Sequence, residues 1–99
     1  MKVLFKPSAE KTIHELADYI TEQISMPATA NKYIDKLLSF AKSISNIPNT
    51  FPICKYPAWK SKKLYCITFD KTWVFAFKIV KDNVVIYHVV NGKLLNYPS

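Results

Sequence analysis

The chain has 99 residues, of which 49% are hydrophobic, and its fourteen basic and seven acidic residues give a formal net charge of +7. This length suits one domain spanning residues 1–99 with one modest core, and it excludes a second domain or a repeat array. The positive balance favours an anionic partner, which is a nucleic acid, a membrane surface or an acidic protein.

Several classes of protein are disfavoured. The apolar runs are too short for a transmembrane helix. The apolar stretch within the N-terminal MKVLFKPSAEK is too short for the hydrophobic core of a signal peptide. We therefore predict a cytoplasmic protein without a membrane partner. Cys54 and Cys66 are expected to be reduced thiols, at least one of them in the core. Their spacing and the absence of a histidine cluster predict no metal site, and we expect no cofactor.

Residues 2–6 predict a short strand that ends at Pro7, and Ser8 is the expected N-cap of a helix. Apolar residues then recur with helical spacing, and His14 falls outside their stripe as a solvated residue. A break at residues 25–27 precedes a second amphipathic helix that ends near Pro48. Because the break is short, the two helices should form an antiparallel hairpin. The first stripe consists of Ala9, Ile13, Leu16, Ala17, Ile20 and Ile24, and the second of Ala30, Tyr33, Ile34, Leu37, Leu38, Ala41 and Ile44.

The second half of the chain predicts a three-stranded meander. Residues 50–62 contain two prolines and favour an irregular loop or an edge strand. Strand-like runs follow at residues 63–69, 72–80 and 83–90, separated by two short turns without glycine. In the middle run the large apolar side chains alternate with smaller ones, so the large face should pack on the helices. The predicted fold is α+β, β-α-α-β-β-β, an antiparallel sheet with a two-helix hairpin on one face.

The only glycine of the chain, Gly92, follows the last predicted strand within Asn91-Gly92-Lys93. A residue without a Cβ permits a sharp turn, and Asn91 also tolerates a left-handed backbone. Two interpretations explain the glycine equally well from the residues: a simple tight turn, or a turn that borders a functional site.

This order of elements resembles the RelE/ParE superfamily of toxins from bacterial type II toxin–antitoxin modules. The resemblance covers nearly the whole chain and is carried by AEKTIHELADYI, ATANKYIDKL, VFAFKIVKDNVVIYHVV and the following NGK. The family usually has His-Gly and then a basic residue after the last strand, where this chain has Asn91-Gly92-Lys93. The resemblance favours the second interpretation of Gly92.

The run at residues 55–63 interleaves four lysines with Tyr56 and Trp59. This composition suits phosphate contacts and base stacking, but it also suits a solvated loop whose aromatic residues pack under the sheet. His88 shares its predicted face with Val84, Ile86 and Val90. It is therefore a core or edge residue, or a proton carrier beside Lys78 if that face lies away from the helices.

The resemblance implies two activities. Some members of the superfamily are ribosome-dependent mRNA endoribonucleases, or mRNA interferases, and others are gyrase inhibitors that bind DNA gyrase without a catalytic constellation. Such systems include plasmid stabilisation modules. For the nuclease, candidate charge donors are Lys60, Lys62, Lys63 and Lys93, and candidate proton carriers are His88 and Tyr97. Tyr97 is otherwise a hydrophobic anchor for the tail.

All fourteen basic residues are lysines, and lysine cannot grip a phosphate with the bidentate fork of arginine. This departure from the arginine-containing nucleases weakens the catalytic hypothesis. A third hypothesis is a toxin-fold binding protein without catalytic activity or toxicity. The resemblance also implies a cognate antitoxin protein as partner. An acidic antitoxin segment would suit the +7 charge, and the helix hairpin and the sheet edge are the expected docking places.

Overall fold

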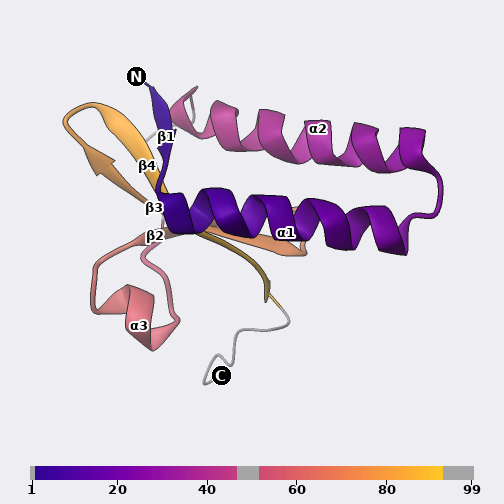
Figure 1. Ribbon diagram of the computed structural model, residues 1–99. Coiled ribbons are helices and arrows are strands. Elements are labelled where there is room, and N and C mark those ends of the chain that lie inside the picture. The colour runs from indigo at the N-terminus through magenta and orange to yellow at the C-terminus, as the bar shows by residue number, and fades with distance from the viewer. Residues whose placement is uncertain (1, 47–51, 93–99) are drawn as a thin grey trace.

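A computed structural model describes residues 2–46 and 52–92 (Figure 1). The four strands form one sheet in the order β1-β4-β3-β2. Two long helices lie side by side on one side of this sheet, and a third, short helix lies on the other side (Figure 1). The elements in chain order are β1 Val3–Phe5, α1 Pro7–Gln23, α2 Pro27–Ser43, the 3-10 helix Ile44–Asn46, α3 Pro57–Lys60, β2 Tyr65–Phe69, β3 Trp73–Val80 and β4 Asn83–Asn91.

The α+β fold and the order β-α-α-β-β-β are confirmed, with one difference in the sheet. Strands β2, β3 and β4 form the predicted antiparallel meander. Strand β1, however, pairs with β4 in parallel, from Val3 opposite Val84 to Phe5 opposite Ile86, so the sheet is mixed. The direction of a strand depends on how the intervening chain returns to the sheet. Two parallel strands must be joined by a long crossover connection, and here residues 6–82 separate β1 from β4. The apolar pattern of a three-residue strand carries no information about it.

The two predicted helices are present, and their stripes face the sheet. Ala9, Leu16 and Ile20 of α1 and Ala30 and Leu37 of α2 are buried. Both helices begin with proline at the first turn, where the missing N–H costs nothing. The expected cap at Ser8 is wrong. Lys6 is the N-cap of α1, and Ser8 Oγ donates instead to Tyr87 O at 3.2 Å.

The main core lies between the helix hairpin and the sheet. Trp73, Phe75 and Phe77 of β3 pack there with the apolar stripes of the helices, as the alternation predicted. His14 is exposed on α1, as expected. In the part of the chain that the structure describes, no helix is both long and apolar enough to cross a bilayer.

The turns of the meander use left-handed backbone without glycine. Asp70 and Lys71 have φ of 54° and 53°, and Lys81 and Asp82 have φ of 49° and 66°. Val80 pairs with Asn83 across the second turn, so Lys81 and Asp82 form a two-residue loop of type I′. These turns match the right-handed twist of the strands, which explains their use in spite of the unfavourable φ.

Gly92 does not make the expected left-handed turn, because its φ is not positive. Its N–H donates to Thr72 O at 2.7 Å and so extends the contact between β4 and the start of β3. A Cβ at this position would lie 3.2 Å from Val74 Cγ2. The close approach of the backbone to Val74 therefore explains the glycine, and a special backbone conformation does not.

Candidate functional site

The chain between Pro52 and Leu64 folds over the sheet face that is opposite the helix hairpin. We call this segment the basic connection. Its centre is α3, which begins at Pro57 and ends in a Schellman motif. In this motif Lys63 N donates to Lys60 O and Leu64 N donates to Trp59 O. Lys63 occupies the left-handed position with φ of 57°, where glycine is usual. A helix this short was not predicted, because four residues show no periodicity.

Trp59 fastens the basic connection to the sheet. It is only 6% exposed and packs with Cys54 and Leu64 on Val74 and Ala76 of β3, which makes a second, smaller core. Its ring also stacks on His88, with centroids 5.2 Å apart and planes at 8°. A buried ring has little face left for a nucleotide base. The alternative interpretation of the 55–63 run, in which its aromatics pack under the sheet, therefore holds for Trp59.

His88 lies on this same face, and a β-bulge puts it there. Ala76 pairs with His88 but Phe77 pairs with Ile86, so Tyr87 is an extra residue in β4. One extra residue reverses the side-chain alternation. The prediction that His88 shares a face with Val84 and Ile86 is therefore wrong, since those two residues lie in the main core. Val90 does share the face of His88.

The environment of His88 favours the neutral imidazole. Burial lowers the pKa of His88 below its ordinary 6.5, and the positive charge of Lys62 lowers it further. The structure thus brings together two of the candidate residues, Lys62 from the basic connection and His88 from β4. A neutral imidazole at pH 7 can accept a proton.

The remaining candidates are less clustered. Lys60 and Lys63 are exposed on the basic connection, as is Lys62. Lys93 and Tyr97 lie outside the described residues. The structure adds one basic residue that sequence reasoning missed: Lys6 Nζ lies 5.0 Å from the ring centroid of Tyr87, beside His88 in the sequence. This cation–π contact joins the N-cap residue of α1 to the extra residue of β4, and the sequence pattern does not predict it.

The expectation of reduced cysteines is wrong in this structure, because Cys54 and Cys66 form a disulfide. The basic connection returns alongside β2, where Ile53 forms a bridge with Tyr65. Cys54 N donates to Leu64 O, and Cys66 N donates to Pro52 O. This pairing brings the two Cα atoms within 4.9 Å although twelve positions separate them. Cys54 is buried as predicted, at 1% exposed.

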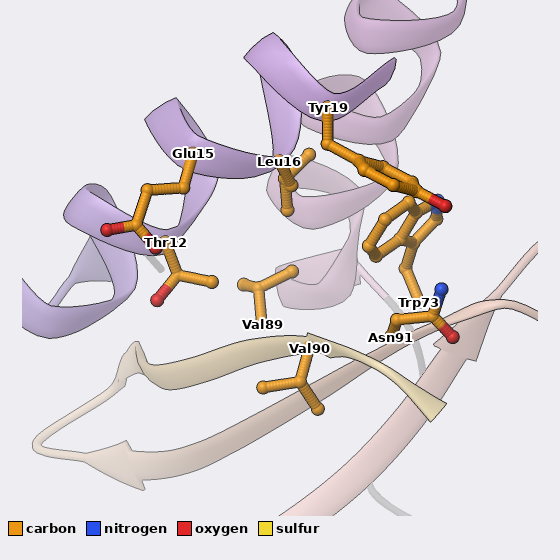
Figure 2. A pocket seen from close by; sticks show the side chains of 8 residues that line it. All are labelled: Thr12, Glu15, Leu16, Tyr19, Trp73, Val89, Val90 and Asn91. Atoms are coloured by element: carbon orange, nitrogen blue, oxygen red, sulfur yellow. The ribbon is translucent and has the colours of Figure 1, made fainter. Parts of the chain in front are cut away.

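A groove on the other side of the sheet is a second candidate site. It has a volume of about 310 Å³ and lies between α1 and the end of β4 (Figure 2). Figure 2 shows Val89 pointing toward α1 and Val90 pointing to the opposite face of the sheet. Its lining is formed by Thr12, Glu15, Leu16, Tyr19, Trp73, Val89, Val90 and Asn91.

Tyr19, Trp73 and Asn91 also line a neighbouring groove of about 280 Å³, which extends to Gln23 and Ile24 at the end of α1. Tyr19 is the residue of α1 that the two grooves share. Its ring meets Trp73 edge-on, with centroids 6.4 Å apart, yet Tyr19 remains 48% exposed. Sequence reasoning missed Tyr19, although an aromatic residue next to the apolar stripe of a helix is a signal that could have indicated this groove. The sequence analysis gave only the general expectation of docking beside the helix hairpin or at the sheet edge.

Among residues 2–46 and 52–92, no three His, Cys, Asp or Glu side chains gather in a geometry that would hold a metal ion. The candidate sites are thus two surfaces. The first, which we call the basic face, carries Lys6, Lys60, Lys62 and Lys63 around the covered His88. The second is the apolar groove along α1. Both lie on a small sheet with a helix hairpin on one face, the general arrangement that the resemblance to the RelE/ParE superfamily implied.

Comparison with known proteins agrees with this fold. A family model described as ParE toxin of type II toxin–antitoxin system, parDE, matches residues 3–95. A comparison with curated proteins gave no match. Because the family match extends from β1 through β4, the chain belongs to the ParE toxin family of type II toxin–antitoxin systems.

Proposed function

We propose that this toxin acts in the cytoplasm by binding DNA gyrase, and that a cognate antitoxin holds it inactive. The observation that carries the proposal is the position of His88. It is the one histidine among the candidate residues, and Trp59 stacks on its ring. A covered imidazole beside exposed, flexible lysines supports a binding surface more than a catalytic centre.

The basic face provides a surface of suitable chemistry for such a target. Lys60, Lys62 and Lys63 extend from the basic connection, and Lys6 adds charge beside Tyr87. A gyrase bound to DNA presents phosphates and acidic side chains, to which lysines bind as point charges. Binding of this kind requires exposed charge on a rigid support, and the packing of Trp59 provides the support.

A supercoiling assay with purified gyrase, relaxed plasmid and ATP tests the proposal. We expect the toxin to inhibit supercoiling, and we expect Lys60→Ala with Lys62→Ala to weaken inhibition. The matched control is Lys11→Ala with Lys32→Ala, which removes two exposed lysines from the long helices. Unchanged supercoiling at a large excess of toxin would contradict gyrase as the target. Equal effects of the two double variants would contradict the basic face as the binding surface.

The proximity of Lys62 to His88 favours a second candidate, a metal-independent endoribonuclease that cuts mRNA on the ribosome. A neutral His88 would accept the proton of the 2′-hydroxyl, and Lys62 would stabilise charge on the phosphate. Lys60, Lys63, Lys93 and Tyr97 stay candidates for the rest of such a site.

Primer extension on mRNA from a coupled translation reaction separates the two candidates. New cuts that disappear in the variant His88→Ala with Lys93→Ala would establish the nuclease and its site. Intact message together with inhibited supercoiling would support gyrase. If neither assay responds, the chain is a toxin-fold binding protein without toxicity of either kind.

We assign the groove along α1 to the antitoxin. The pairing of β1 with β4 covers only Val84–Ile86, and beyond it α1 and the groove flank β4. Apolar side chains of an antitoxin segment would fill the groove around Tyr19, and acidic residues of that segment would suit the +7 charge.

This assignment is tested by co-expression with the product of a small reading frame adjacent to the gene. Tyr19→Ala is expected to weaken the complex, whereas Met26→Ala, which truncates an exposed apolar residue outside the groove, should leave it intact. Added salt should also weaken binding, because it screens the opposite charges. An affinity that is insensitive to salt would contradict the electrostatic part.

A further inference from the structure

The Cys54–Cys66 disulfide closes a ring of chain around the basic connection. The ring contains α3, Trp59 and the lysines at positions 55, 60, 62 and 63. The disulfide is therefore the covalent link that ties the N-terminal end of this lysine-bearing segment to β2.

Apart from the disulfide, the basic connection is held by contacts with the sheet face opposite the long helices. Its backbone contacts with the segment that leads into β2 include the bridge of Ile53 with Tyr65 and the hydrogen bonds from Cys54 N to Leu64 O and from Cys66 N to Pro52 O. Its apolar contacts are those of Cys54, Tyr56, Trp59 and Leu64 in the smaller core, and the stack of Trp59 on His88. The long helices and the main core lie on the opposite face and do not include these residues. The basic connection is thus a separate small unit that can open while the main core stays folded.

The two cysteine residues differ in exposure. Cys54 is 1% exposed inside the smaller core, whereas Cys66 is partly exposed on β2. A thiol from solution can therefore reach Cys66 more easily than Cys54. The nearby lysines also attract anionic thiols, and they raise the local concentration of such reagents.

We propose that Cys66 is a thiol–disulfide exchange site for anionic low-molecular-weight thiols, and that reduction there releases the basic connection from the sheet. The inference is independent of the proposed target, because it concerns the covalent state and conformation of the chain itself.

The exchange runs in two balanced steps. A thiolate attacks Sγ of Cys66, a new S–S bond forms, and Cys54 leaves as a thiolate that takes up a proton. A second thiolate attacks the small thiol's sulfur in this mixed disulfide and releases Cys66, which also takes up a proton. The protein gains two electrons and two protons, and two thiols are oxidised to one small disulfide.

Release of the basic connection would change the basic face. Trp59 would leave its place over His88, and Lys62 would no longer be held near the imidazole. The pKa of His88 would then rise toward its ordinary 6.5 because both causes of its depression weaken. The oxidised state thus holds the charges in fixed positions, and the reduced state frees them.

The exchange site is tested with the wild-type chain, purified without reductant and treated with reduced glutathione under native conditions. Acid quenching and peptide mass spectrometry then locate the mixed disulfide. We expect glutathione on Cys66 and a faster reaction than with a neutral thiol of similar size. Glutathione on Cys54, or a disulfide that resists native reduction, would overturn the proposal.

The release is tested with trypsin, which cuts after lysine. Reduction is expected to accelerate cleavage within residues 55–63 on the order of tenfold, while cleavage in the long helices and the far-UV circular dichroism stay unchanged. The variant Cys54→Ser with Cys66→Ser should behave like the reduced chain. Nuclear magnetic resonance titration of His88 should show its pKa rising on reduction. Unchanged cleavage would overturn the proposed release of the basic connection. Loss of the helical circular dichroism on reduction would overturn it too, because the disulfide would then stabilise the whole fold.

Discussion

The indole N–H of Trp73 donates to the hydroxyl of Tyr33 at 3.0 Å and so joins the start of β3 to α2 across forty positions of sequence. The same hydroxyl donates to Asp70 Oδ2 at 2.8 Å, in the turn before β3. Burial raises the pKa of Tyr33 above 10.0, and the hydrogen bond to Asp70 raises it further. One phenol therefore fixes the helix hairpin, the turn and the aromatic wall of the groove relative to one another.

Removal of this hydroxyl should destabilise the fold. We expect Tyr33→Phe to lower the free energy of unfolding by about 1–3 kcal/mol, because the partly buried Trp73 N–H loses its acceptor. Urea denaturation measures the change, and Tyr19→Phe on the exposed side of α1 is the control. If both variants unfold at the same denaturant concentration, the hydrogen bond contributes little.

Acid should weaken the fold through His88. Its pKa in the folded chain lies below 6.5, so between these two values the unfolded chain binds more protons than the folded one. Stability is therefore greatest above about pH 6.5 and falls as the pH drops through the folded-state pKa. His88→Phe should flatten this part of the profile, and His14→Gln, at an exposed position of α1, should leave it unchanged. Urea midpoints between pH 5 and pH 8 test this. A profile that His88→Phe does not alter would contradict the assigned cause.

Lys63 allows charge and backbone conformation to be separated. Its left-handed φ of 57° disfavours any side chain, so Lys63→Gly should stabilise the fold by about 1 kcal/mol. Lys63→Ala removes the same charge but keeps the unfavourable conformation, and it should not stabilise the chain. Thermal unfolding compares the two variants. If toxicity depends on the Lys63 charge, both should lose it equally in spite of their different stabilities.

Substitutions in the hairpin turn between β3 and β4 should stabilise the fold. Lys81→Asn with Asp82→Gly gives the residues that type I′ turns prefer, and we expect a stabilisation of about 1 kcal/mol. The two substituted residues lie in the β3–β4 turn, outside the basic connection. Inhibition of the target should therefore stay the same. The denaturant midpoint is the measurement, and a lower midpoint would show that Lys81 or Asp82 makes a compensating contact.

The sequence by itself determined the elements and their order. Residues such as Leu16 and Leu37 recur with a period near 3.6, and Phe75 and Phe77 alternate with a period of 2, so the faces that form the main core follow from local geometry. Turn positions followed from short polar breaks. These features together carried the resemblance that the family comparison confirmed.

Only the tertiary structure decided the arrangement of the candidate sites. The extra residue Tyr87 moves His88 to the face opposite Ile86, and an inserted residue leaves no trace in composition. Cys54 meets Cys66 because the basic connection pairs beside β2, which depends on contacts remote from either cysteine. The groove exists because α1 crosses the end of β4. Local periodicity fixes which face of an element is apolar, but the relative placement of elements is set by packing between distant residues.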